Sequence, residues 1–213
     1  MAIAFGAVTS VTTGNPTTGP TVTGSDTVGI VFHMGDSAAD NLSAVDWGGS
    51  AMTKITSVQT PGDRWISAWY VIAPSSGATI TFTGSTVNRA FSLYYTGAKQ
   101  TGQPDSSNTG TSSANAAITV ATTVVASNCW TLMFQKDDAG SITYSTSVGT
   151  MRINADAGGL AMSDSNGTVG TGSQSTTLTG TGTPNHGGIA FSIAPSVAVT
   201  GSVSSNLSLL GVG

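Results

Sequence analysis

The most constraining feature of this chain is a series of short runs in which apolar and hydroxyl-bearing side chains alternate, almost without long charged residues. Glutamate does not occur, and charged residues make up 8% of the 213 residues. Valine, threonine and aromatic residues favour a pleated, half-buried surface, whereas an amphipathic helix needs charged or polar side chains along its solvent face. The sequence therefore predicts an all-β fold.

Turn signals separate these runs at intervals of about eight to twelve residues, a spacing typical of β-sandwiches and barrels. Gly48 and Gly49 lie between alternating runs within 45–55 and predict a tight hairpin, because glycine accepts the positive φ angles of such a reversal. Strands are predicted at 27–34, 65–73, 78–83, 90–96, 117–125, 129–135 and 188–194, with shorter strands near 142–145, 150–154, 160–163 and 176–179. We expect a two-sheet β-sandwich, jelly-roll-like or a related Greek key, because one flat sheet rarely holds so many strands.

The length of the chain is compatible with one large β domain, and we expect a single β-sandwich domain over residues 1–195. The segment 97–115 is rich in Thr, Ser, Gly and Asn and is predicted to be the longest loop. Residues 196–213 alternate small polar residues with valine and leucine, which indicates a C-terminal arm. Two alternatives are open for this arm: pairing with an edge strand or a neighbouring subunit, or a frayed terminus.

The charge pattern argues against two kinds of partner. The formal net charge is -4, the isoelectric point is near 4.6, and the six basic residues are scattered, so we expect no nucleic-acid partner. No apolar run reaches the roughly 18 residues that a membrane helix needs, so we expect no membrane partner. The first residues carry no basic segment followed by an apolar stretch, so we expect a protein made in a cytoplasm, without a signal peptide.

No residue pattern indicates catalysis. All ten carboxylate side chains are aspartates, most of them in turn-like contexts, and Asp46, inside a predicted strand, is the least easily explained. A glycosidase needs two facing carboxylic groups, and a serine hydrolase of the α/β type needs a strained Gly-x-Ser-x-Gly turn that is not found here. We therefore expect a protein that is not an enzyme.

No cofactor or metal site is expected either. The segments 137–140 and 164–167 place Asp beside Gly and offer calcium ligands, but the same residues are the commonest turn formers, and no distant bidentate acid completes a loop motif. His33 and His186 have no Cys or Glu at ligand spacing, which does not support zinc. Cys129, the single cysteine, is interpreted as a small core residue.

Aromatic residues are the remaining candidates for a site. Trp47, Tyr70 and Tyr94 are candidates for a ligand or subunit contact, because aromatic side chains on an exposed sheet stack on sugar rings or pack against a neighbour. The adjacent pairs at 69–70 and 94–95 must point to opposite faces of their strands, so one member of each lies in a core or on an outer surface. Core packing explains most of these residues, and subunit contact is preferred over ligand binding for the others.

Three stretches, 45–55, 65–74 and 91–100, carry distinctive motifs. The first is a Trp-Gly-Gly hairpin followed by Met-Thr-Lys, the second is an aromatic strand that ends in Pro-Ser, and the third closes on a Tyr-Thr-Gly turn. Together they resemble β-sandwich modules of tailed-bacteriophage virion proteins and of some bacterial surface proteins. The resemblance covers about residues 27–125 and includes no catalytic residue. It implies a role in particle architecture or attachment, with no reaction.

The expected function is that of a non-enzymatic virion structural protein, a capsid decoration or fibre-like component that acts through assembly contacts. Its expected partners are other copies of itself and a capsid or tail protein, and its expected location is the virion. A surface with few charges suits a protein that is packed among copies of itself. The alternative function is a carbohydrate-binding or adhesin module that uses exposed aromatic residues on a glycan.

Overall fold

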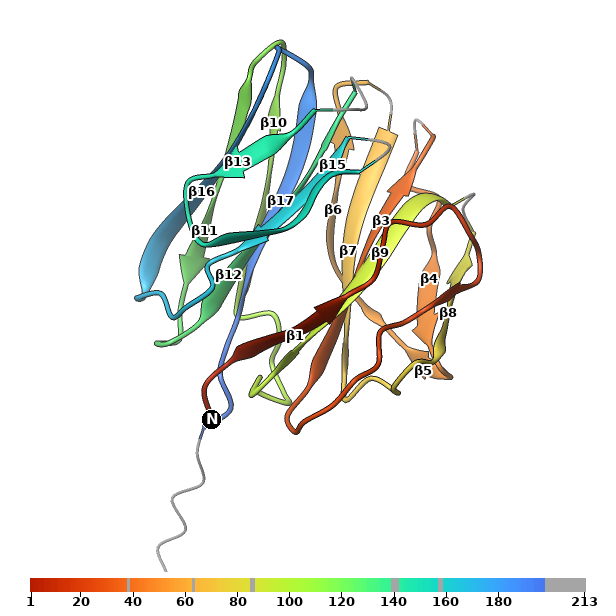
Figure 1. The fold of residues 1–213 in the computed structure, drawn as a ribbon, viewed down its shortest axis with the longest axis vertical. Helices are drawn as coiled ribbons and strands as arrows, with labels where there is room; N and C mark the ends of the chain where they lie inside the picture. The colour runs from red at the N-terminus through yellow and green to blue at the C-terminus, as the bar shows by residue number, and fades with distance from the viewer. Residues whose placement is uncertain (38, 63, 85–86, 139–141, 157–158, 198–213) are drawn as a thin grey trace, which may run out of the picture.

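The computed structural model describes residues 1–197 except 38, 63, 85–86, 139–141 and 157–158. Every regular element among these residues is a β-strand, and all strand pairings are antiparallel (Figure 1). The predicted all-β sandwich-type fold is therefore confirmed.

The chain divides into two halves, residues 1–98 and residues 99–197, which contain nine and eight strands respectively. The strands of the first half are β1 (Ala4–Val8), β2 (Thr17–Thr18), β3 (Val28–Gly35), β4 (Ala44–Trp47), β5 (Ser50–Ala51), β6 (Thr53–Thr60), β7 (Arg64–Ile72), β8 (Thr79–Thr83) and β9 (Val87–Thr96). Those of the second half are β10 (Ser106–Ser112), β11 (Ala117–Val124), β12 (Trp130–Asp137), β13 (Tyr144–Thr146), β14 (Thr150–Asp156), β15 (Leu160–Asp164), β16 (Gly172–Gly180) and β17 (His186–Ile193).

Each half forms an inner and an outer sheet. The inner sheets have the strand orders β1-β9-β3-β7-β6 and β10-β17-β12-β15-β14, and the outer sheets have the orders β2-β8-β4-β5 and β11-β16-β13. The two inner sheets face each other across the largest apolar cluster, and a smaller cluster lies between each inner sheet and its outer sheet. The molecule is thus a stack of four layers, where the sequence predicts two sheets (Figure 1).

The two halves repeat one topology. When β5 and β6 are counted as one interrupted strand, both inner sheets have the order 1-8-3-6-5 and both outer sheets contain 2-7-4, numbered within each half. Strands that alternate between two facing sheets, with the first paired to the last, form a jelly roll. The chain is therefore a tandem pair of jelly rolls whose inner sheets pack face to face.

The central inner strands are buried on both faces. All residues of β3 and all residues of β12 are buried, because each strand has an inner sheet on one side and an outer sheet on the other. In β3, Phe32 points into the cluster between the halves and Val31 points into the cluster behind it. The ring of Phe32 lies 4.4 Å from the ring of Phe134 on β12, measured between centroids, so the two halves meet at well-packed aromatic side chains.

Several local predictions are confirmed. Gly48 and Gly49 adopt φ angles of 61° and 89° and join β4 to β5 as a tight hairpin. The carboxylate of Asp46 accepts a hydrogen bond from the Gly49 N–H (2.7 Å), so this aspartate has a structural role in the turn. The predicted strands at 27–34, 65–73 and 78–83 correspond to β3, β7 and β8.

The predicted loop at 97–115 is wrong in its second part, because that part contains β10. This strand pairs with β17 from Ser106 opposite Ser192 to Ser112 opposite His186. Its residues are mostly half-buried or exposed, as suits the edge strand of an inner sheet, so its sequence needs no apolar alternation. The predicted arm begins at Ser196, whose N–H donates to the Gly97 carbonyl (2.7 Å), and the remainder of that prediction, 198–213, lies outside the described residues.

Candidate functional site

Two of the three aromatic residues predicted as contacts lie inside the protein. Trp47 is 0% exposed, within the cluster between the sheets of the first half, and its indole N–H donates to the Ser75 carbonyl (2.8 Å). Tyr94 is 4% exposed, with its hydroxyl 3.2 Å from the Thr23 hydroxyl. Gly6 of β1 packs directly on the Tyr94 ring, where any larger side chain would collide with it. Trp47 and Tyr94 therefore do not lie on the surface, where a ligand or subunit contact would require them.

Tyr70, the third candidate, is half-buried. It lies on β7 directly after Trp69, whose side chain belongs to the cluster behind the inner sheet. Tyr70 instead packs against the cluster between the halves, so the two side chains point to opposite faces, as predicted. Its packing is explained by this core contact.

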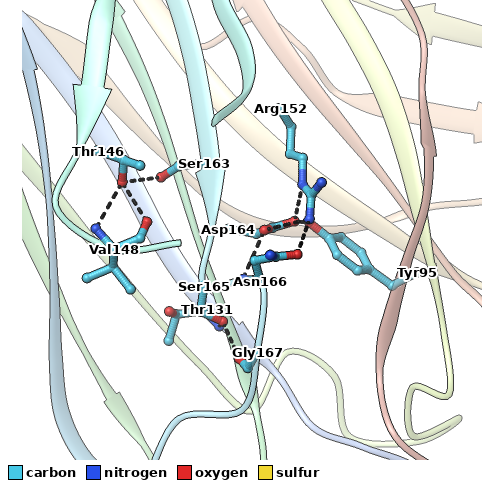
Figure 2. Close-up of polar contacts among 10 residues, drawn as sticks. All are labelled: Tyr95, Thr131, Thr146, Val148, Arg152, Ser163, Asp164, Ser165, Asn166 and Gly167. Atoms are coloured by element: carbon cyan, nitrogen blue, oxygen red, sulfur yellow. Dashed lines mark hydrogen bonds and ion pairs between the residues drawn. The ribbon is translucent and has the colours of Figure 1, made fainter. Parts of the chain in front are cut away.

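A buried ion pair of the second half contacts residues of the first half (Figure 2). The Asp164 side chain on β15 is 0% exposed, and it accepts hydrogen bonds from Arg152 Nε (2.8 Å) and Nη2 (3.1 Å) on β14. The same carboxylate accepts a hydrogen bond from the Tyr95 hydroxyl (2.7 Å), which comes from β9 of the other half. The Arg152 guanidinium also lies 4.0 Å from the centre of the Phe5 ring on β1. We call these four residues, Phe5, Tyr95, Arg152 and Asp164, the clasp.

The clasp has a structural role. The Asn166 N–H donates a further hydrogen bond to Asp164 (3.1 Å), so four donors surround one carboxylate. Burial raises the pKa of Tyr95 well above its ordinary value, and the neighbouring Asp164 raises it further, which keeps the hydroxyl protonated and donating. A carboxylate that is saturated with hydrogen bonds and closed to solvent has no capacity left for a substrate or a metal ion.

A second buried polar group lies at the start of β17 and the end of β12. The Tyr144 hydroxyl donates to Asp137 (2.7 Å), and burial, followed by this hydrogen bond, raises the pKa of Tyr144. The two ring nitrogens of His186 lie 3.0 Å from the Gln135 amide oxygen and 2.8 Å from the Asn115 carbonyl oxygen. These contacts hold strands of the second half together, and both ring nitrogens of His186 have partners within the fold.

Two buried basic side chains, Lys136 and His33, each have a nitrogen atom without a hydrogen-bond partner among the described residues. Burial lowers the pKa of Lys136 to about 8, and Nζ of this 1% exposed residue has no hydrogen-bond partner among the described residues. Burial also lowers the pKa of His33 to about 4, against the opposing effect of Asp40. His33 Nδ1 lies 3.5 Å from the Ser67 hydroxyl, and within the described part of the chain Nε2 has no partner.

The two segments considered for calcium serve other roles where they are described. Asp164 belongs to the clasp. Asp138 accepts hydrogen bonds from the Asn185 N–H (2.9 Å) and side-chain amide (2.7 Å), while 139–140 lie outside the described residues. Among the residues that the structure describes, no three His, Cys or Asp side chains are grouped to hold a metal ion.

Cys129 is a core residue, as predicted, with 0% exposure. Burial raises the pKa of its thiol to about 12, and the nearby Asp105 adds to this effect. The thiolate that would act as a nucleophile is therefore strongly disfavoured. The Asp105 carboxylate itself accepts hydrogen bonds from the N–H groups of Val125 (2.7 Å) and Ala126 (3.2 Å).

A cavity of about 620 Å³ lies at the end of the molecule where the first and last described residues meet. We call it the end cavity. Its wall is mostly apolar and combines five segments, which are the chain start, Lys99, the β11–β12 turn, Thr168 and the segment after β17: Met1, Ala2, Lys99, Ala126, Ser127, Asn128, Thr168, Ala194, Pro195, Ser196 and Val197. The backbone N of Met1 donates to the Ser196 carbonyl (2.7 Å), which holds the two segments together. Such a cavity has the size of a ligand or peptide site, and sequence reasoning missed it because its wall is assembled from five distant segments.

Comparison with known proteins finds no matching family model, no matching curated protein and no matching solved structure. Within the described residues, no helix is long and apolar enough to cross a membrane.

Proposed function

We propose that this protein is a non-enzymatic virion structural protein, a capsid decoration or fibre-like component that works through contacts with its own copies and with a capsid or tail protein. The observation that carries the proposal is the tandem of jelly rolls packed into one four-layer body. Jelly rolls are recurrent building blocks of viral capsids. The resemblance of residues 27–125 to phage virion modules points in the same direction.

The outer surfaces support an assembly role. On β8, the outward residues Thr79, Thr81 and Thr83 are exposed, while the residues between them are buried. The outer sheet of the second half likewise exposes hydroxyl groups, with Thr119 opposite Thr177 across β11 and β16. Interface cores are depleted of charged residues, so broad hydroxyl-bearing faces with few ion pairs are suited to subunit packing.

The internal polar groups support a structural role rather than a reaction. The clasp and the Tyr144–Asp137 contact place acidic side chains in closed hydrogen-bonded groups, without room for a substrate. The alternative of a carbohydrate-binding module depended on exposed aromatics, and burial of Trp47 and Tyr94 removes two of its three candidates. No other observation favours that alternative.

Size-exclusion chromatography with light scattering, at 0.1 M and 1 M NaCl, tests the proposal together with co-sedimentation of the protein with particles and shell proteins of its source. We expect an assembly or a particle-bound form that persists at high salt, because few ion pairs contribute to its contacts. A salt-independent monomer that binds no shell protein would contradict the proposal. Saturable binding of a polysaccharide in calorimetry, without self-association, would favour an adhesin instead.

A further inference from the structure

We propose that the end cavity is the docking site for residues 198–213 of a second copy of this chain, so that two copies exchange their C-terminal arms. This inference rests on the proposed assembly function and specifies the contact that carries it. It starts from the cavity, whose volume is about 620 Å³ and whose wall is mostly apolar.

Exposed apolar side chains gather at this end of the molecule. Among the described residues, the large hydrophobic side chains that are exposed are Met1 (55%), Val125 (69%) and Val197 (81%). Met1 and Val197 line the end cavity, and Val125 immediately precedes Ala126 in its wall. Exposed apolar groups that collect around one cavity, and are rare elsewhere, mark an interaction surface.

The arm has the chemistry that this surface requires. Residues 198–213 contain no charged side chain, and the wall of the end cavity contains one charged side chain, that of Lys99. Fully extended, the 16 residues of the arm span about 50 Å, which is long enough to cross to a neighbouring molecule. Its larger apolar residues alternate with small polar ones: Val199, Val203, Leu207, Leu209, Leu210 and Val212.

The starting point of the arm favours a second copy over the same chain. Residues Ala194 and Val197 form part of the cavity wall, and Ser196 is fixed there by its hydrogen bond to Gly97. Because Ala194–Val197 already form part of the wall, an arm that filled its own cavity would have to fold back onto the residues that it follows. Across a two-fold axis it enters the facing cavity directly, and one self-complementary contact then covers Met1, Val125 and Val197 of both copies.

Disulfide trapping tests this exchange. Two differently tagged full-length variants, Ser127→Cys in the cavity wall and Leu209→Cys in the arm, are mixed and oxidised, and the cross-linked peptides are identified by mass spectrometry. We expect a covalent pair with Ser127→Cys of one chain joined to Leu209→Cys of the other. Cys129 does not compete, because it is buried. The matched control replaces the cavity variant with Ser145→Cys, an exposed serine on β13, and should give at least tenfold less product.

Two results would overturn the exchange. One is a cross-link that forms no faster than with Ser145→Cys. The other is a cross-link found only within one chain of the double variant S127C/L209C, which would assign the cavity to the chain's own arm. If light scattering still shows an assembly in either case, the proposed function stands and only this inference fails. As a second readout, Ser127→Trp should fill the cavity and weaken self-association at least tenfold, whereas Ser145→Trp should not.

Discussion

Replacing Asp164 by asparagine should uncouple the clasp and strongly destabilise the protein. The substitution keeps the shape of the side chain but removes its charge from a site that is 0% exposed. Arg152, whose side chain is 15% exposed, would then keep its charge without a carboxylate partner. The amide NH2 of the new asparagine would also face donors, because the Tyr95 hydroxyl and the Arg152 guanidinium both donate to the present carboxylate.

The size of the effect follows from this geometry. Removing one partner of a buried, hydrogen-bonded ion pair costs about 3–5 kcal/mol, because the remaining charge stays buried and uncompensated. For a chain of this size, 1 kcal/mol corresponds to roughly 2–4 °C in Tm, so the variant should unfold on the order of 10 °C lower. The matched control is Asp36→Asn, which removes the partner of Arg64 in an exposed pair (48% and 34% exposed) and should cost less than about 1 kcal/mol.

Urea unfolding followed by tryptophan fluorescence, together with calorimetry, measures both variants against the unmodified protein. Loss of stability should be several times larger for Asp164→Asn than for Asp36→Asn. Tyr95→Phe should lie between them, since it removes one hydrogen bond to a charged group, worth about 1.5–3 kcal/mol. If Asp164→Asn costs no more than Asp36→Asn, the claim that the clasp holds the two halves together is refuted.

Three further predictions follow from single buried groups. Because folding lowers the pKa of His33 from 6.5 to about 4, its neutral form stabilises the fold above pH 6.5, and roughly 3 kcal/mol is lost as the pH falls toward 4. His33→Leu should flatten this part of the pH profile in urea titrations at pH 7, 5 and 4, and equal slopes for the two proteins would contradict the assignment. Lys136→Met should raise the free energy of unfolding by about 1–3 kcal/mol, because burial of this amine without a hydrogen bond in the described structure outweighs its attraction to Asp137. A loss of stability would show that the attraction is the larger effect. Gly97→Ala should lower the free energy of unfolding by about 2–3 kcal/mol or more, because the backbone strain of a positive φ (68°) adds to the clash of a Cβ placed 2.0 Å from a backbone oxygen. Gly77→Ala, at a φ of 60° in open space, should cost only about 1 kcal/mol in the same assay. Equal losses for the two glycine variants would show that crowding at Gly97 relaxes.

The recurrence of one jelly roll had a weak signal in the sequence. Residues 90–93 read Ala-Phe-Ser-Leu and residues 190–193 read Ala-Phe-Ser-Ile, and these segments lie in the last strands, β9 and β17, of the two halves. Phe91 and Phe191 both pack on Phe32 between the halves. A search for repeats at a spacing of 100 residues would have pointed to a tandem fold and to four layers instead of two.

The candidate contacts show why a site is harder to predict than a strand. Alternation placed Trp69 and Tyr70 on opposite faces of β7 correctly, since side-chain direction follows from the two-residue period of the strand itself. Whether a face meets water depends on what else the chain brings to it. Trp47 is enclosed because Gly19 and Gly29, the latter on β3 of the inner sheet, lie against its ring, and neither is near it in the sequence.

By itself, the sequence determined that this protein is built of antiparallel strands with tight glycine turns and has a single cysteine in its core. These properties depend on residue type and on neighbours a few positions away, which local patterns record. Only the tertiary structure decided that two jelly rolls share one core, that Asp164 and Tyr95 form a clasp between them, and that distant segments enclose the end cavity. These features arise from pairing between residues far apart in the chain, and the energy of such pairing is distributed over contacts that no single stretch of sequence contains.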